Sequence, residues 1–343
     1  MQHEITVEKR LLKADGSLLE PGYSKKLLLN YEREDIKANP IRIKEWDYYL
    51  INNDRFAFAL TIADNSYMGL DSVSFMDFEK KWHHTKSYMS FMTMGKKNLP
   101  ETSSYGDIIS NGKCYSLKFL NDGKKRILYA NLDDFMKNVK LVAMIELSEE
   151  PLESMVIATP YKEDKKAFYY NQKINCMKAS GYVEFNKTRY EFSQINSCAV
   201  LDWGRGVWTY RNTWYWGSAS GYVNNIPFGF NIGYGFGDSS AASENMVIFD
   251  GKAHKLDKVE FVIPLKNGKD DFLAPWKFIS NDNRFEMDFV PIIDRSSYTS
   301  LGIIKSDQHQ VFGKFSGHVI LDNSEKIEIK DFIGFAEKVF NKW

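Results

Sequence analysis

The stretch Arg55–Ile62, which reads RFAFALTI, decides the fold class. Its large apolar residues occupy every second position, with small residues between them. A period of two is typical of a β-strand with one buried face, whereas a helix repeats every 3.6 residues. Similar runs are expected to form further strands at Tyr67–Phe78, Lys86–Met94, Lys113–Phe119, Arg126–Leu132, Val139–Leu147, Met155–Thr159, Met246–Phe249, Val259–Leu265, Phe285–Ile293 and Val311–Leu321.

Turn residues separate these runs at Asn52–Asp54, Asn121–Gly123, Asp250–Gly251 and Asn267–Gly268. Asn and Gly tolerate the positive φ that tight hairpins need. Many short strands at this spacing predict an all-β protein of antiparallel barrels or sandwiches. A length of 343 residues suggests two domains. Charge and turn residues cluster near Pro160–Lys166, so we expect an arm and first β domain at 1–165 and a second β domain at 166–343.

The C-terminal segment allows two interpretations. Phe332, Phe335, Val339 and Trp343 recur at helical spacing, and Asp331 could cap the start of a helix. The alternative is a final strand through Ile333–Lys338.

Composition excludes several classes of protein. The formal net charge is zero and the lysines are scattered, which argues against a nucleic-acid partner. Three distant cysteines, Cys114, Cys176 and Cys198, argue for a reducing compartment. The sequence lacks both a signal-peptide pattern and an apolar run of membrane-spanning length, so a cytoplasmic protein without a transmembrane segment is expected.

The most unusual segment is Val200–Gly221, VLDWGRGVWTYRNTWYWGSASG. Gly204 and Gly206 indicate a sharp turn. Asp202 is a candidate catalytic acid, because burial among aromatic rings raises the pKa of a carboxyl group. The alternative is a structural ion pair of Asp202 with one of two arginines. The candidate ligand-binding residues of this segment are Trp203, Arg205, Trp208, Arg211, Trp214 and Trp216, and the tryptophans could equally fill a core.

A second unusual segment, Pro227–Gly237 (PFGFNIGYGFG), alternates large apolar residues with glycines. A strand with a glycine face allows a ligand or another backbone to approach closely. Asn231 lies on that face and is a candidate ligand-binding residue. Glu244, beyond the next turn, is a second candidate acid or else a turn cap. The glycines lack the helix that a dinucleotide site needs, and no His/Cys/Asp grouping has zinc-site spacing, so we expect no cofactor and no metal.

The chain resembles an uncharacterised bacterial family classed as a domain of unknown function. The matching stretches are Glu45–Tyr49, Phe168–Cys176, Asp202–Gly206 (DWGRG), Tyr210–Gly221, Gly229–Asp238, Ser243–Gly251 and Gly334–Trp343. More distantly, the hairpin from Gly181, the Asp202 segment and the late GFAE resemble the two-barrel lipocalin-like superfamily of carotenoid hydratases (hydroxyneurosporene synthase) and AttH-like proteins. This resemblance implies two tandem lipocalin-like β-barrels, acid chemistry on polyene or terpenoid-like substrates in some members, and a last strand whose Glu337 faces the cavity.

These observations favour a cofactor-free hydratase or isomerase acting on a small hydrophobic, lipid- or isoprenoid-like molecule. Asp202 or Glu244 would protonate the substrate, and Arg205 or Arg211 would tune the acid or bind a polar head. The tryptophans would stabilise positive charge by cation–π attraction. Two alternatives stay open: a non-catalytic lipocalin-like carrier or sensor, and a carbohydrate-active protein that uses Asp202 and Glu244 as a pair.

Overall fold

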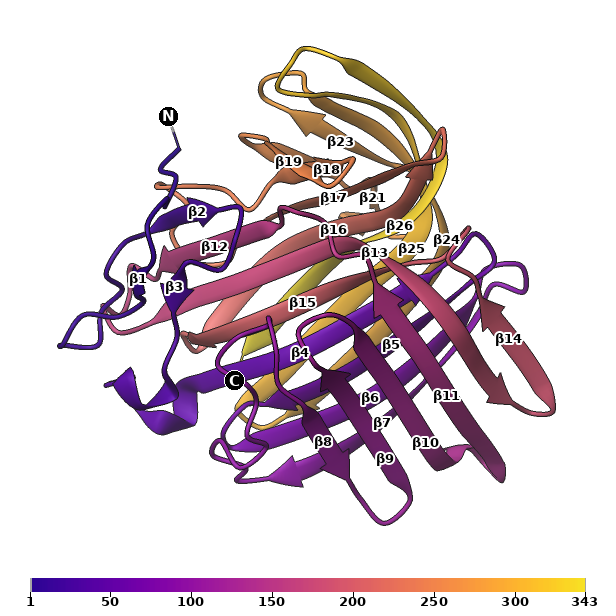
Figure 1. The fold of residues 1–343 in the computed structure, drawn as a ribbon, viewed down its shortest axis with the longest axis horizontal. Coiled ribbons are helices and arrows are strands. Elements are labelled where there is room, and N and C mark those ends of the chain that lie inside the picture. Colours follow the sequence, from indigo (N-terminus) through magenta and orange to yellow (C-terminus); the bar gives the residue numbers. More distant parts are fainter. Residues whose placement is uncertain (1, 343) are drawn as a thin grey trace.

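The computed structural model describes residues 2–342, which form two large antiparallel sheets (Figure 1). Each sheet curls into a half-barrel, so the expected all-β fold of two tandem lipocalin-like barrels is confirmed. In this range helical structure is limited to two 3-10 turns, η1 (Arg33–Asp35) and η2 (Pro40–Arg42). No helix among the described residues has the length and apolarity to cross a membrane.

The first sheet has 13 strands and the path β7-β6-β5-β4-β15-β13-β11-β10-β9-β8, while β2, β12 and β14 pair at its side. Its strands are β2 (Gly22–Ser24), β4 (Ile43–Asn52), β5 (Phe56–Asp64), β6 (Met68–Asp77), β7 (Trp82–Phe91), β8 (Ile108–Asn111), β9 (Tyr115–Asn121), β10 (Arg126–Met136), β11 (Val139–Ser148), β12 (Met155–Pro160), β13 (Phe168–Phe185), β14 (Thr188–Phe192) and β15 (Cys198–Val207).

The second sheet has nine strands in the order β19-β18-β17-β16-β26-β25-β24-β23-β20. They are β16 (Arg211–Val223), β17 (Ile226–Tyr234), β18 (Met246–Phe249), β19 (Lys252–Lys255), β20 (Val259–Val262), β23 (Trp276–Ser280), β24 (Phe285–Leu301), β25 (Ile304–Ile320) and β26 (Lys326–Lys342). Two short pairs complete the structure: β1 (Lys9–Arg10) with β3 (Leu29–Asn30), and β21 (Leu265–Lys266) with β22 (Lys269–Asp270).

The chain changes sheet between Val207 and Arg211, not at the expected boundary near Pro160–Lys166. The long strand β13 and its neighbour β15 belong to the first sheet, because they pair with β11 and β4. The segment Val200–Gly221 therefore contributes one strand to each sheet and joins the two half-barrels.

The helical interpretation of the C-terminal segment is wrong. Residues 326–342 form β26, which pairs with β16 on one side and β25 on the other. Pairing with β25 along the strand and with β16 over Gly334–Lys342 outweighs the weak helical spacing of the apolar residues. Trp343, the last residue of that pattern, lies outside the described residues.

The prediction of a sharp turn at Gly204 and Gly206 is also wrong, because both glycines lie within the regular strand β15. A Cβ atom on Gly204 would overlap the indole ring of Trp46, and one on Gly206 would overlap the carbonyl oxygen of Phe168. These glycines therefore allow close packing on one face of the strand rather than a turn.

The two sheets meet where an irregularity in β13, at Asn175 and Cys176, packs against β16 and β17. The buried Asn175 amide nitrogen lies 2.9 Å from Ser218 Oγ and 3.1 Å from Ser220 Oγ. It also lies 3.2 Å from the carbonyl oxygen of Phe230. The glycine face of β17 makes this approach possible, since a Cβ on Gly229 would come within 2.7 Å of Cys176 Sγ.

We expect Asn175→Ala to lower the free energy of unfolding by about 3 kcal/mol, because several buried acceptors lose their donor. Urea unfolding followed by tryptophan fluorescence measures the change. Asn131→Ala is the matched control: the half-buried Asn131 lies on β10, and its side-chain oxygen has no hydrogen-bond partner. Equal losses in the two variants would contradict a special role of Asn175 in joining the sheets.

Candidate active site

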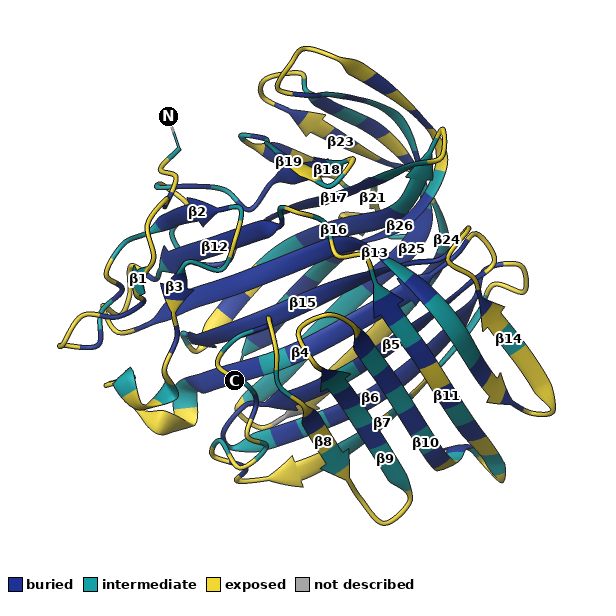
Figure 2. Ribbon diagram, viewed as in Figure 1, coloured by how far each residue is buried: buried dark blue, intermediate teal, exposed yellow. Residues whose placement is uncertain are grey.

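A buried polar cluster lies between the two sheets, where the central strands β4, β13 and β15 are dark blue in Figure 2. Side chains alternate between the two faces of a strand, so every second residue of these strands reaches the cluster. Asp202 is the cross-strand partner of Lys173 on β13 and of Tyr48 on β4, so these three side chains share one face. Tyr48 packs edge-on against Trp216 of the second sheet, with ring centroids 6.0 Å apart. The faces of the two sheets therefore meet at this cluster.

Lys173 and Asp202 form a buried ion pair. Lys173 Nζ lies 2.7 Å from Asp202 Oδ1, and the Asn171 amide donates to the same oxygen at 2.7 Å. The ammonium group also lies 4.1 Å from the centroid of the Trp216 ring. The partner of Asp202 is thus a lysine, and the alternative expectation of an ion pair with Arg205 or Arg211 is wrong.

Glu244 lies in the same cluster, just before β18, with 4% of its surface exposed. Neither carboxyl oxygen has a hydrogen-bond partner. Burial is the main cause that raises its pKa to about 7; nearby Asp202 adds to the increase, and Lys173, the Asn231 side chain and Lys255 oppose it. The lack of a side chain on Gly233 provides the space, because a Cβ there would overlap Glu244 Oε1.

The backbone around Glu244 is held firmly. The Asn245 side-chain oxygen accepts from the Gly233 amide at 2.7 Å, and Asn231 donates to the Glu244 carbonyl oxygen at 2.8 Å. The half-buried Lys255 ammonium donates to the Asn245 carbonyl at 2.8 Å. Glu244 is therefore a fixed carboxyl group without a partner, rather than a turn cap.

Glu337 on β26 is the third buried carboxyl, as the resemblance implied for a last strand. It accepts hydrogen bonds at 3.0 Å from the Trp214 indole and from the Gln310 amide. Burial raises its pKa, and the two donors together with nearby Arg295 and Lys173 limit the increase. We refer to Asp202, Glu244 and Glu337 as the carboxyl cluster.

Aromatic rings enclose this cluster, and we define the aromatic cage as Trp46, Tyr169, Trp208, Trp214 and Phe236. Phe236 stacks on Tyr169 at 4.8 Å between centroids, and Trp208 contacts Trp214 edge-on at 5.3 Å. Burial, together with Glu244 and Asp202, raises the pKa of Tyr169 far above its usual value. Its hydroxyl therefore stays protonated, with Lys173 Nζ at 3.5 Å.

A narrow cleft leads to Glu244 and has room for about one water molecule. Its wall is formed by Ile157, Thr159, Tyr169, Gly233, Tyr234, Gly235, Phe236, Ser239, Ala242 and Glu244. Phe236 enters this wall because the strand ends at Tyr234 and Gly235 has φ +96°. Its ring consequently leaves the face that it was expected to share with Phe228 and Phe230, and packs between the sheets.

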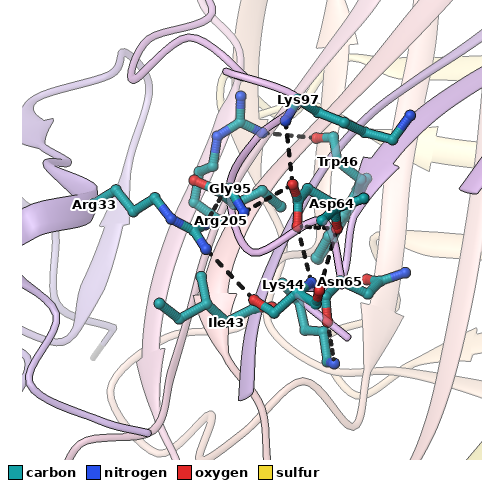
Figure 3. Close-up of polar contacts among 12 residues, drawn as sticks. Arg33, Ile43, Lys44, Trp46, Asp64, Asn65, Gly95, Lys97 and Arg205 are labelled. Atoms are coloured by element: carbon teal, nitrogen blue, oxygen red, sulfur yellow. Dashed lines mark hydrogen bonds and ion pairs between the residues drawn. The ribbon is translucent and has the colours of Figure 1, made fainter. Parts of the chain in front are cut away.

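Three expected ligand-binding residues lie elsewhere. Trp203 and Arg205 point to the opposite face of β15, where Arg205 donates to Asp47 Oδ1 at 3.0 Å and stacks 4.3 Å from the Trp203 ring. Figure 3 shows Arg205 bonded to the Trp46 carbonyl oxygen beside the network around Asp64. Arg211 is exposed, with its guanidinium 5.2 Å from the Phe340 ring. The structure brings together Asp202, Glu244, Trp208, Trp214, Trp216, Asn231 and Glu337.

Sequence reasoning missed the contribution of β13. Tyr169, Asn171 and Lys173 occupy alternate positions of this strand and all reach the site. A lysine and an asparagine at the same phase as an aromatic residue, directly after the aromatic run Phe168–Tyr170, are the signal that could have identified them. No group of three His, Cys, Asp or Glu residues within residues 2–342 could hold a metal ion.

Solved structures with the same fold include kievitone hydratase from Nectria haematococca, with a TM-score of 0.53, 10% identity and 98% of both chains covered. A putative AttH from Nitrosomonas europaea has a TM-score of 0.47 and 9% identity, covering 90% of this chain and 96% of its own. CghA, solved with Sch210972, has a TM-score of 0.45 and 10% identity, covering 98% and 97%.

Comparison with curated protein sequences gave no match. The sequence profile described as Domain of unknown function (DUF2804) matches residues 2–343. The expected membership of a domain-of-unknown-function family is therefore confirmed, and the chain belongs to the DUF2804 family.

Proposed function

We propose that this protein is a cofactor-free enzyme of the hydratase or isomerase type, in which Glu244 protonates an unsaturated, largely hydrophobic substrate. The observation that carries this proposal is the isolation of Glu244. It is a buried carboxyl group without a hydrogen-bond partner, facing a cleft between two sheets. Orphaned buried polar groups cost stability and concentrate at functional sites.

The pKa of Glu244 suits a proton donor. At about 7 it leaves about half of the molecules protonated at neutral pH, and a general acid is most effective when its pKa lies near the working pH. Once the proton has left, the nearby Lys173 ammonium stabilises the new carboxylate. Lys173 therefore reduces the cost of the charge that forms on Glu244 during the reaction.

The other groups account for the remaining steps of a hydration. Protonation of a carbon–carbon double bond by Glu244 leaves a positive charge on the neighbouring carbon, which the faces of the aromatic cage stabilise. Water adds its oxygen to that carbon and gives a proton to the Asp202 carboxylate, from which it returns to Glu244. In an isomerisation, a substrate proton leaves in place of water addition.

The fold gives independent support. The similar structure with the TM-score of 0.53 is, by its name, a hydratase. At 10% identity this likeness establishes a shared architecture, so the chemistry of the present chain rests on its own carboxyl cluster.

We expect Glu244→Gln to reduce proton transfer to substrate by at least about a hundredfold, because glutamine cannot act as an acid. The assay incubates the protein in D2O with a panel of terpenoid alkenes, polyenes and prenylated phenols, and follows deuterium incorporation by mass spectrometry. Glu260→Gln is the control, since Glu260 is exposed on β20. Equal activity in wild type and Glu244→Gln would refute the proposal. Retention of a ligand with equal affinity by both proteins, without product, would identify a carrier.

The raised pKa also predicts how stability depends on pH. The folded-state pKa of about 7 exceeds the usual value of 4.5, so folding becomes less favourable as the pH rises through this interval. The loss reaches about 3 kcal/mol above pH 7. Glu244→Gln cannot ionise, so it should gain up to that amount relative to wild type between pH 4.5 and pH 8.5. Urea unfolding at both pH values measures this gain, and Glu260→Gln should show none.

A further inference from the structure

Two further polar groups of the site lack partners. The Trp208 indole nitrogen and the Tyr161 hydroxyl have no hydrogen bond, although the residues are only 3% and 6% exposed. Their rings lie 6.2 Å apart, and Trp208 contacts Tyr169 at 5.8 Å. Indole N–H is a donor only, and burial raises the pKa of Tyr161 so that its hydroxyl keeps its proton. Both groups can therefore donate to an oxygen atom, and none of the described residues provides one.

The Phe236 ring contacts both the cleft that leads to Glu244 and the ring of Trp208. It lines the cleft with Glu244, and its centroid lies 6.2 Å from that of Trp208. Glycines flank it on both sides, Gly235 with φ +96° and Gly237 with φ +76°. Phe236 is thus a bulky apolar side chain on a backbone segment whose glycines permit rearrangement.

We propose that Phe236 occupies the place of a substrate ring, and that its displacement lets Trp208 and Tyr161 bind a neutral oxygen of the substrate. The ligand class is then an unsaturated or aromatic molecule that carries a ketone, ether or phenolic oxygen, rather than a pure hydrocarbon. This inference deepens the proposed function and rests on it for the reaction, but the binding step can be tested alone.

The two donors match a neutral oxygen. Trp208 and Tyr161 are both uncharged, and the Lys173 charge is already matched by Asp202. Arg42 lies beside them, and its Nε donates to the Trp208 carbonyl oxygen at 2.9 Å. An uncharged acceptor needs no counter-ion in this buried region. It also removes the cost of two unpaired buried donors, which a hydrocarbon would leave in place.

The test uses two probes of similar shape, naphthalene and 2-acetylnaphthalene, of which only the ketone accepts hydrogen bonds. Phe236→Ala removes the ring and provides space for either probe. We expect this variant to bind the ketone at least about tenfold more tightly than naphthalene, as measured by titration of tryptophan fluorescence. Adding Tyr161→Phe should remove most of that preference and leave naphthalene binding unchanged. Trp208→Phe should act in the same direction.

The control is Tyr67→Phe, which removes another buried hydroxyl without a partner, one that lies outside the aromatic cage. It should not alter the preference. Should Phe236→Ala fail to fold, Phe236→Val retains part of the packing and serves in the same titrations. Equal affinity for the two probes, or an unchanged preference after Tyr161→Phe, would overturn the proposal.

The binding test separates this inference from the proposed function. Introducing Glu244→Gln beside Phe236→Ala should leave the preference for the ketone intact, because Glu244 does not bind the oxygen. Absence of proton transfer together with an intact preference would remove the acid chemistry and keep the oxygen-binding site. Loss of the preference for the ketone while proton transfer stays active would remove the oxygen-binding site and keep the acid chemistry.

Discussion

The buried ion pair of Lys173 and Asp202 is the constraint on which the rest of the site depends. Three carboxyl groups lie in the region between the sheets, and the ammonium of Lys173 is paired with one of them, Asp202. Burial in a region of low dielectric disfavours the ionised form of the other two. It is the largest cause that raises the pKa of Glu244 and that of Glu337, and the charge of Asp202 adds to the increase at Glu244. Burial beside an ion pair that is already matched thus keeps a carboxyl group partly protonated at neutral pH.

The geometry of the two sheets delivers these residues to one place. Because side chains alternate along a strand, β15 directs Asp202 towards the second sheet and Arg205 into the first half-barrel. The chain then crosses to the second sheet, where Trp214 and Trp216 face back towards Asp202. One segment, Val200–Gly221, therefore builds both walls of the site, and a shift of one residue in either strand would dismantle it.

Periodicity was enough to predict the all-β fold from stretches such as Arg55–Ile62, and aromatic density directed attention to Asp202. The partner of Asp202 could not be predicted in this way, because Lys173 meets it through the register of β13 against β15, which long-range packing sets. The glycines of the DWGRG stretch were misinterpreted for a related reason. Gly204 is required by a Trp46 ring that lies on a different strand, and a turn and a close approach look alike in sequence.

The narrow cleft and the raised pKa of Glu244 both result from the burial of this residue between the two sheets. Burial is the largest cause of the raised pKa of Glu244, so water admitted to the cleft would lower that pKa and ionise the acid. Phe236, stacked on Tyr169, narrows the cleft and limits the water that can reach Glu244. A substrate that replaces its ring by another apolar group keeps the carboxyl group dry and protonated. An acid of this kind can therefore act only on a ligand that is hydrophobic where it meets Glu244, with polar recognition confined to the far side of the aromatic cage.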